Sequence, residues 1–353
     1  MEMSSTVHNE LGHQPKHRNS STNIQTHYDG KKNAKGSGDD ENDADSVDKA
    51  VVKAPYDPNR LCTQNQYAKS LNMTLSEYAV SMDTWMDNKV EFERDQTKLT
   101  NGHPHNWDRF SAFQVMGECT QNCIGGPCRA DVSKITCGVD EEVMKAPCVV
   151  YSIGGNNQWQ FENDVLAKTP CEVHTFDCTG PKERFVKPDN DRLHFHHVCL
   201  GSKNVDAPAP EDRLDSVQSV HGEFWTLRKM QQTLNHTQID LFKVDIEGYE
   251  FPMFEAWPTL TEISAATAVL PMQVLVEVHY QTHMPELSWH RKVDWKWSND
   301  MVNLQKHFIK MGYAVVVRDD NRQCPHCTEL TLVRMRCPAT ADAVLADAVS
   351  VIE

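Results

Sequence analysis

The sequence predicts an α/β fold, a seven-stranded, mostly parallel sheet with helices on both faces and a terminal antiparallel hairpin. Two observations predict it. After Pro147, short apolar runs alternate with helical stretches, and this alternation is typical of a parallel sheet that is covered on both sides. The last two apolar runs are joined through 319–328 without a helix. They are therefore expected to pair antiparallel, because a parallel return needs a long crossover.

The individual elements follow from hydrophobic periodicity. The expected strands are 148–153, 172–176, 193–200, 239–244, 274–278, 313–318 and 330–334. The expected helices between them are 160–167, 224–234, 250–257 and 301–311. Upstream, apolar residues recur at three- or four-residue steps from Leu71 to Arg94, which predicts an amphipathic helix packed on the main domain. Seven strands that end in a hairpin are the class I methyltransferase arrangement.

Composition divides the chain into four parts. Residues 1–55 are expected to be a disordered polar tail, because the stretch from His13 to Asp48 has almost no apolar residue to offset the entropy of ordering. Residues 56–146 form a helical and Cys-rich lead-in. Residues 147–340 form the main domain, and 341–353 form a C-terminal tail.

Charge and hydropathy exclude some partners. The net charge of −15 argues against nucleic acid, since phosphate contacts need clustered Lys and Arg. No apolar run of about 18 residues predicts a membrane span. The segment Met1–Glu10 has no apolar core of a signal peptide, which favours the cytoplasm. Twelve cysteines and three Asn-x-Ser/Thr triplets keep a secretory lumen open.

The cysteines do not follow a zinc-binding pattern. The segment 118–128 is interpreted as a loop-rich lead-in with scattered thiols, because its spacing is not a repeated CxxC pair. A lone CxxC at 324–327 lies in the expected hairpin. A disulfide or free thiols are expected there rather than zinc or redox catalysis.

The turn after the first strand is a candidate cofactor site. Gly154, Gly155 and Asn156 follow that strand, but Trp159 and polar residues fill the later glycine positions of a dinucleotide fingerprint. A pyrophosphate would fit poorly, which opposes a nicotinamide enzyme. S-adenosylmethionine carries no phosphate and is compatible with this turn. An ordinary tight turn is the alternative.

An acidic residue strengthens the cofactor interpretation. Asp177 ends the second strand, 23 residues after Gly154. An acid about 20 residues after the first glycine is where this kind of fold binds ribose hydroxyls. The alternative is an aspartate that caps the next turn.

Carboxylates crowd the end of the fourth strand. Asp245, Glu247 and Glu250 follow this strand, with Gly248 at the sharp turn. Such crowding is unfavourable unless the carboxylates meet a cation, a metal or a proton. The cofactor sulfonium is one such cation.

The fifth strand ends with Glu277 and His279, which share one side by period-two alternation. If the fourth and fifth strands are neighbours, these groups converge with Asp245 and Glu247. His279 is then a candidate general base, with a structural histidine as the alternative. A divalent metal on these four residues is conceivable by ligand type, but no metal is expected.

Together these motifs resemble the eukaryotic methyltransferase-like family, which is itself similar to FkbM-type methyltransferases. The segments that carry the resemblance are 131–137, 150–154, 159–162, 174–177, 243–250 and 277–279. The resemblance covers about residues 105–337. It implies a class I fold, S-adenosylmethionine as donor and hydroxyl acceptors such as sugars or polyketides. Ser152 stands where an acidic residue commonly ends the first strand, and Glu162 is a candidate substitute near the methionyl group.

The predicted function is S-adenosylmethionine-dependent O-methylation of a small hydroxylated acceptor. A non-catalytic copy of the fold that binds a ligand or partner is the alternative. The predicted catalytic residues are Asp245, Glu247 and His279. The predicted cofactor-binding residues are Gly154, Gly155, Asn156, Glu162 and Asp177.

Overall fold

The computed structural model describes most of the chain between residues 60 and 337. The described residues are 60–62, 65–99, 107–130, 132–213, 219–263, 267, 269–280, 296–320, 324 and 326–337. The expected tails, 1–55 and 341–353, lie outside these residues. Within the described part of the chain, no helix is long and apolar enough to cross a membrane.

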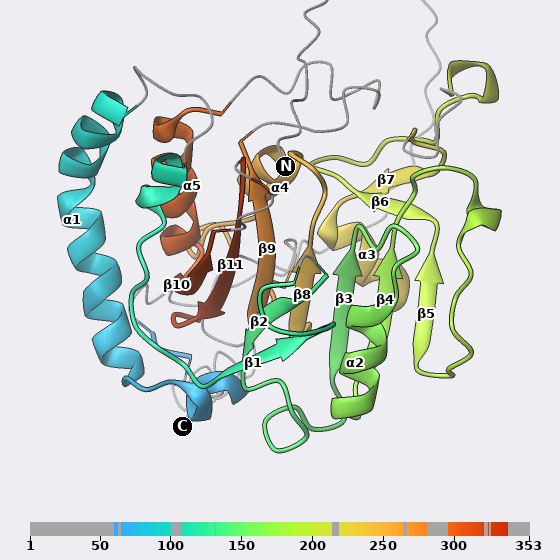
Figure 1. Cartoon of the computed structure of the whole chain (residues 1–353), viewed down its shortest axis with the longest axis horizontal. Helices are drawn as coiled ribbons and strands as arrows, with labels where there is room; N and C mark the ends of the chain where they lie inside the picture. The colour runs from blue at the N-terminus through green and yellow to red at the C-terminus, as the bar shows by residue number, and fades with distance from the viewer. Residues whose placement is uncertain are drawn as a thin grey trace, which may run out of the picture. The chain divides into compact units, whose positions relative to one another are not determined.

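A seven-stranded sheet organises the fold, in the order β10-β11-β9-β8-β3-β4-β5 (Figure 1). Its strands are β3 (Val149–Ile153), β4 (Glu172–Phe176), β5 (Leu193–His196), β8 (Leu241–Val244), β9 (Gln273–His279), β10 (Tyr313–Asp319) and β11 (Cys327–Arg334). Only β11 is antiparallel to its neighbours, β9 and β10. The expected mostly parallel sheet with a terminal hairpin is thus confirmed, and it is the class I methyltransferase arrangement.

The strand order reverses between β3 and β8. From β3 the chain runs outward through β4 to β5, and then returns to the other side of β3 as β8. In open α/β sheets, ligands bind beyond the carboxyl ends of the strands at such a switch point. The fold therefore directs attention to the residues that follow Ile153 and Val244.

Helices cover both faces of the sheet, as expected. On one face, Glu162 of α2 (Gln160–Lys168) contacts Thr175 of β4. On the other face, His236, just after α3 (Leu227–Leu234), contacts Tyr151 of β3. Successive strand residues point to opposite faces, and Tyr151 is the register partner of His174 rather than of Thr175. α2 and α3 thus lie on opposite sides of β3 and β4.

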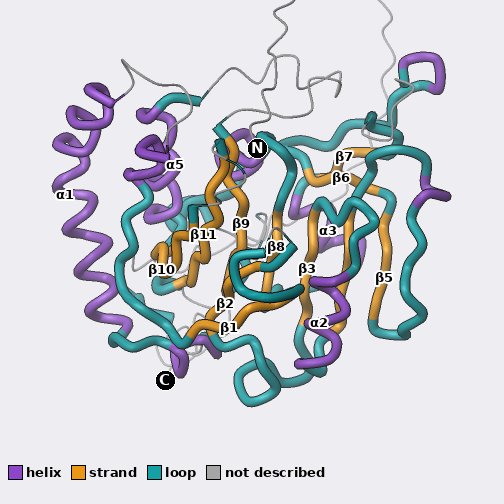
Figure 2. The backbone as a smooth tube through the Cα atoms, in the orientation of Figure 1, coloured by secondary structure: helices purple, strands orange, loops and turns teal. Residues whose placement is uncertain are grey.

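The remaining helices are α1 (Leu75–Leu99), α4 (Glu250–Glu255) and α5 (Ser298–Lys310). α1 and α5 lie side by side (Figures 1 and 2). The helical pattern from Leu71 to Arg94 did not define where the helix starts; α1 begins at Leu75 and extends to Leu99. Thr74 and Glu77 form a reciprocal capping box, which fixes the first helical turn at Leu75. Short 3-10 helices span Gln66–Ser70, Trp107–Ala112, Lys182–Arg184 and Pro210–Asp212.

Two expected elements are corrected. The apolar run 193–200 is two strands, because the chain leaves the main sheet after His196 and continues as β6 (Val198–Leu200). β6 pairs instead with β7 (Glu223–Trp225). The expected helix at 224–234 therefore begins only at Leu227, where the Thr226 side chain caps it. Aromatic residues at 224–225 favour the extended conformation.

The Cys-rich lead-in contains a hairpin that the sequence analysis did not predict, β1 (Gln121–Ile124) with β2 (Lys134–Cys137). Its thiols are not free. All twelve cysteines pair, as 62–337, 119–137, 123–128, 148–171, 178–199 and 324–327. The side chain of Gln273 holds β2 through both backbone groups of Cys137, at 2.8 and 3.1 Å. The hairpin thus packs directly on β9.

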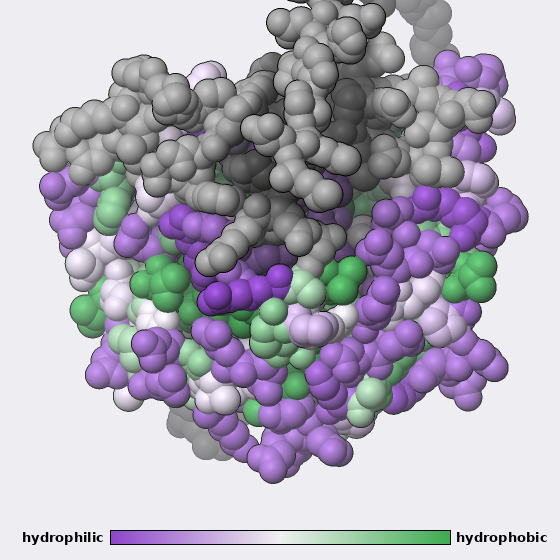
Figure 3. Space-filling model, viewed as in Figure 1, coloured by the Kyte–Doolittle hydropathy of each residue, from purple (hydrophilic) through white to green (hydrophobic). Residues whose placement is uncertain are grey.

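The central strands are buried along their whole length. Every residue of β8 and β9 is buried, as continuous apolar runs predict for the middle of a parallel sheet. The visible outer surface is mainly hydrophilic with scattered apolar patches (Figure 3). Lys243, Glu277 and His279 are charged exceptions within these two strands. Buried ionisable groups need partners, and these partners define the site.

Candidate functional site

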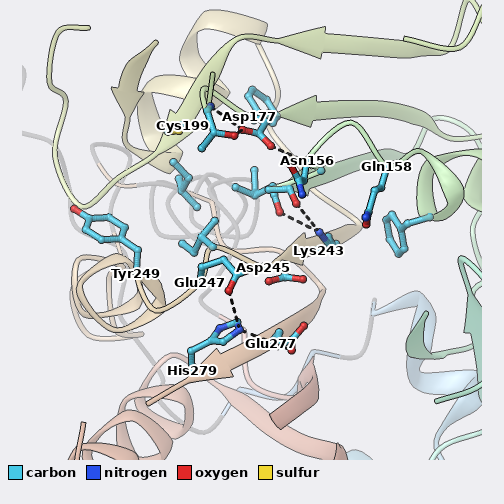
Figure 4. A pocket seen from close by; sticks show the side chains of 18 of the residues that line it. Asn156, Gln158, Asp177, Cys199, Lys243, Asp245, Glu247, Tyr249, Glu277 and His279 are labelled. Atoms are coloured by element: carbon cyan, nitrogen blue, oxygen red, sulfur yellow. Dashed lines mark hydrogen bonds and ion pairs between the residues drawn. The ribbon is translucent and has the colours of Figure 1, made fainter. Parts of the chain in front are cut away.

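A cavity of about 400 Å³ opens at the switch point of the sheet. Its walls come from the carboxyl ends of β3, β4, β8 and β9 (Figure 4). The volume lies within the range of small-molecule sites. All eight predicted site residues line this cavity: Gly154, Gly155, Asn156, Glu162, Asp177, Asp245, Glu247 and His279.

Gly154 lets β3 pass close to β8. Its backbone has a φ of +78°, and a Cβ atom there would lie 1.8 Å from the carbonyl oxygen of Asp245. Any side chain would therefore collide with the neighbouring backbone. The main chains of β3 and β8 therefore meet closely at the cavity.

Asp177 links the ends of β3 and β4. Its Oδ2 accepts the backbone N–H of Asn156 at 2.8 Å (Figure 4). Its Oδ1 accepts the backbone N–H and the hydroxyl of Thr179, at 2.9 and 2.6 Å. Asp177 thus caps the turn, as the alternative interpretation held. Carboxylate oxygens accept more than one hydrogen bond, so a ribose diol can still bind to them.

Glu162 is a buried acid with an unsatisfied oxygen. Its side chain is 1% exposed, and Oε2 has no hydrogen-bond partner. Burial raises the pKa of Glu162, although the Ser152 hydroxyl and the charge of Lys243 oppose this shift. A buried unpaired carboxylate oxygen is unfavourable, unless a donor from a ligand pairs with it.

Lys243 is a site residue that the sequence analysis missed. Its Nζ donates to the carbonyl oxygens of Ile153 and Gly154, at 3.3 and 3.2 Å (Figure 4). The sequence contained a signal for this residue, because a lysine inside an apolar, buried strand is unusual. Lys243 fixes the position of the glycine turn from β8.

Lys134, from β2, is the second missed residue. Its Nζ lies 3.4 Å from Asp245 Oδ2 and 3.1 Å from Glu277 Oε2, and it also bonds Glu329. Burial alone would lower the pKa of the Lys134 ammonium, but the three carboxylates hold it well above its usual value. Burial would raise the pKa of Asp245, but Lys134, Lys243 and His279 hold it well below its usual range.

His279 lies among carboxylates. Its Nδ1 is 3.1 Å from Glu250 Oε1. Its Nε2 is 3.6 Å from Glu247 Oε2 and 3.8 Å from Glu277 Oε1 (Figure 4). The backbone N–H groups of Ile246 and Gly248 orient the same Glu250 oxygen. The expected convergence of β8 and β9 groups is therefore observed.

The environment favours the imidazolium form of His279. Burial alone would lower its pKa, but Glu250, Glu277 and Asp245 raise the pKa of His279 to about 10. At neutral pH the ring is therefore positively charged. This charge does not support the predicted role of general base, because a base must begin without the proton. It supports a role in holding the surrounding carboxylates.

This shift predicts how stability depends on pH. A histidine with a raised folded pKa stabilises fully below its unfolded pKa of about 6.5, and this contribution is lost as the pH rises toward 10. The free energy of unfolding should fall by up to about 1.4 kcal/mol per pH unit between pH 6.5 and 8.5. Urea denaturation measures it. His279→Gln should have a flatter profile, and an equally steep profile in this variant would contradict the assignment.

Glu247 occupies a strained turn at the edge of the cavity. Its φ is +57°, a conformation that is uncommon for residues other than glycine, and Gly248 follows at +106°. The Glu247 side chain is 33% exposed. Burial and the charge of Asp245 raise the pKa of Glu247. Strained non-glycine residues cluster at functional sites. Here the turn places Glu247, whose carboxyl has a raised pKa, at the cavity wall.

Comparison with known families identifies the chain. Residues 78–334 match a methyltransferase-domain family. The chain belongs to this methyltransferase family. Its fold is the class I arrangement described above, and membership makes the protein an enzyme of the methyl-transferring class with S-adenosylmethionine as the implied donor. No curated protein matches the chain.

The family match helps to interpret the lead-in. It begins at Tyr78, inside α1, and therefore includes β1, β2 and Lys134. The methyltransferase contains part of its cavity wall in this segment, because Val132 and Lys134 line the cavity. The sequence analysis included residues 131–137 in the family resemblance but assigned no site role to Val132 or Lys134.

The residues of the methyltransferase cavity fit S-adenosylmethionine. The unpaired Oε2 of Glu162 suits a ligand ammonium, and Gly154 and Gly155 bring main chain to the cavity wall nearby. Beyond Asp177, the side chains of Leu200, Val220 and Phe224 form an apolar wall. Sequence reasoning missed this wall because it assigned Phe224 to a helix.

Asp245, Glu247 and His279 are also a possible set of metal ligands. One ligand atom from each lies within 4.8 Å of the others. In this methyltransferase, however, Lys134 and the His279 imidazolium already lie beside these carboxylates. Lys134 is thus one cation that the chain itself supplies to these carboxylates.

Proposed function

We propose that this methyltransferase transfers the methyl group of S-adenosylmethionine to a hydroxyl oxygen of a small acceptor. The observation that carries the proposal is Glu247, a carboxylate of raised pKa in the cavity wall. A carboxylate whose pKa is raised toward the working pH is a better proton acceptor. An acceptor that must lose a proton, such as a hydroxyl, fits this group. FkbM-type enzymes, which the sequence resembles, methylate hydroxyl oxygens.

The geometry supports a set of proposed cofactor-binding residues. Glu162 would pair with the methionyl ammonium, and Asp177 would accept the ribose hydroxyls beside Asn156. Leu200, Val220 and Phe224 would cover the adenine. The backbone of Gly154 and Gly155 would approach the methionyl part closely. When bound, S-adenosylmethionine supplies an electrophilic methyl group.

Three residues would serve the acceptor. Glu247 would take the hydroxyl proton on a carboxylate oxygen as the oxygen becomes methylated. Asp245, held ionised by the two lysines, would orient the hydroxyl by accepting its hydrogen bond. His279 would act as a positioning residue that holds Glu247 through its Nε2, while Glu250 holds its Nδ1. Orientation of this kind supplies much of the rate enhancement in such transfers.

The charge of the cavity restricts the acceptor. Asp245, Glu247 and Glu277 bring carboxylates to the cavity wall at the ends of β8 and β9. Lys134 and His279 lie beside these carboxylates, but the Glu247 side chain is the most exposed of the three, at 33%. A phosphorylated or carboxylated acceptor would meet the charge of Glu247, which disfavours binding. A neutral polyol, sugar or phenol suits the wall better.

Binding followed by turnover tests the function. Calorimetry should show binding of S-adenosylhomocysteine and S-adenosylmethionine but not of NAD. A screen of neutral sugars and phenols should then detect release of S-adenosylhomocysteine, and carboxylated acceptors should be inactive. A folded protein that binds neither adenosyl ligand would favour the alternative, a non-catalytic binding module.

The ribose contact gives a separate prediction. Asp177→Ala should weaken S-adenosylhomocysteine binding by about 1.5–3 kcal/mol, because it removes a charged hydrogen-bond acceptor. Calorimetry measures the change. Asp189→Ala, at an exposed aspartate outside the cavity, is the matched control and should bind normally. Unchanged affinity in folded Asp177→Ala would remove Asp177 from the cofactor site.

A further inference from the structure

A cluster of histidines lies on the sheet outside the cofactor cavity. His174 on β4 is the register partner of His194 on β5, and His196 stands two residues further along the same face. The His174 ring stacks on both, with centroids 4.8 and 5.3 Å apart. Glu172, two residues before His174, shares this face. None of these four side chains lines the cavity.

Three of these residues converge on one point. Glu172 Oε1 lies 2.8 Å from His194 Nε2 and 3.4 Å from His174 Nε2. The three atoms all lie within 4.8 Å of one another. Ligand atoms at tetrahedral angles around Zn²⁺, with bonds of about 2.0–2.1 Å, are about 3.3 Å apart. The two measured separations lie on either side of this value.

The His174 ring is the second observation that points to a ligand. The residue is 4% exposed, and its Nε2 makes no hydrogen bond. Its Nδ1 lies 3.0 Å from His196 Nε2. If Nδ1 donates this bond, then Nε2 carries a buried lone pair directed toward Glu172. Metal-bound histidines have this arrangement, with the second ring nitrogen donating to a neighbour.

We propose that Glu172, His174 and His194 form a Zn²⁺ site. The ligands would be Glu172 Oε1 and the Nε2 atoms of the two histidines, a combination of imidazoles and carboxylate that suits Zn²⁺. The side chains of His194 and Glu172 are 39% and 45% exposed, so water can reach the fourth position. Entry of the ion would give the unpaired nitrogen of His174 a partner.

The position of the site indicates a structural role. His174 precedes the cavity residue Asp177 by three residues, which is about 10 Å along an extended chain. The proposed zinc site is therefore separate from the cavity, which lies beyond the end of β4. β5 is the edge strand of the sheet, and its neighbour there is β4. An ion on Glu172, His174 and His194 would join the two strands through their side chains.

Zinc titration of the full chain tests the proposal, with a chromophoric chelator as competitor. The wild-type protein should bind one more equivalent of Zn²⁺ than His194→Gln or Glu172→Gln. His196→Ala should keep the site but weaken it by about 10–100-fold, the usual effect of losing the partner of a ligand. Bound Co²⁺ should give a visible absorption band in the wild type that both ligand variants lack.

Glu247→Gln is the matched control, because it alters the carboxylate and histidine cluster in the cavity instead. It should bind zinc as the wild type does, and His194→Gln should bind S-adenosylhomocysteine as the wild type does. Equal zinc binding by wild type, His194→Gln and Glu172→Gln would mean an adventitious ion only and would overturn the proposal. If Glu247→Gln lost the additional equivalent of Zn²⁺ while His194→Gln kept it, the ion would bind in the cavity. That result would also overturn the proposal.

Discussion

Glu247→Gln is expected to lower the turnover of the methyltransferase by about 10²–10⁴-fold, the usual effect of losing a general base. The glutamine keeps the shape of the side chain but cannot accept the hydroxyl proton. Binding of S-adenosylhomocysteine should stay unchanged, because the proposed cofactor-binding residues Glu162 and Asp177 lie elsewhere in the cavity wall. Methyl-transfer kinetics and calorimetry on the same preparation measure both quantities.

The control for this experiment is Glu255→Gln. Glu255 is exposed on α4 and does not line the cavity, so the variant should turn over normally. The pH profile separates a base from a positioning residue. The wild-type rate should fall in acid as Glu247 gains a proton, whereas residual activity of Glu247→Gln should lack this fall. A fully active Glu247→Gln enzyme would exclude Glu247 as the base.

Lys134→Met is expected to destabilise the fold by about 3–5 kcal/mol, the range for removing one partner of a buried ion pair. Methionine fills a similar volume but leaves Asp245, Glu277 and Glu329 facing one another without the ammonium between them. Urea denaturation at pH 7 with the disulfides intact measures the loss.

The effect should depend on pH in a defined direction. Without Lys134, the three carboxylates should have raised folded pKa values, so protonation in acid relieves their repulsion and the loss should be smaller at pH 4.5 than at pH 7. Lys168→Met is the control, because Lys168 pairs with Asp164 at the surface. Such pairs contribute about 0–1 kcal/mol. A loss of this small size in Lys134→Met would show that the carboxylates do not need the lysine.

The part of the site on β8 and β9 could be predicted because its information is local. Asp245 and Glu247 follow a buried apolar run, and His279 ends another. Adjacent parallel strands bring such ends together without detailed knowledge of packing. The sequence pattern therefore predicted the cluster, while the ionisation state of His279 depended on Glu250 and the other buried carboxylates around it.

Lys134 could not be predicted, because its role depends on long-range packing. It lies 111 residues before Asp245, in a short hairpin with no periodic pattern. Its position depends on Gln273, which bonds the backbone of Cys137. The sequence analysis recognised that the carboxylates need a cation, but not that this hairpin supplies one.

The break in the run 193–200 was hidden for a similar reason. Val198, Cys199 and Leu200 continue the apolar pattern of β5, so local propensity favours one long strand. The disulfide from Cys199 to Cys178 and pairing with β7 direct the second half away from the sheet. Six disulfides also favour the oxidising compartment that the sequence analysis left open.

The disulfide between Cys62 and Cys337 makes the enzyme a covalent ring. It joins residues 275 apart in sequence, and every strand of the main sheet lies between them. A protease that cuts once in an exposed loop, for instance at Lys203, opens this ring without releasing a piece. The cut enzyme would migrate as a single species until a reductant separates the two fragments, so the molecule tolerates backbone damage that would divide a linear chain.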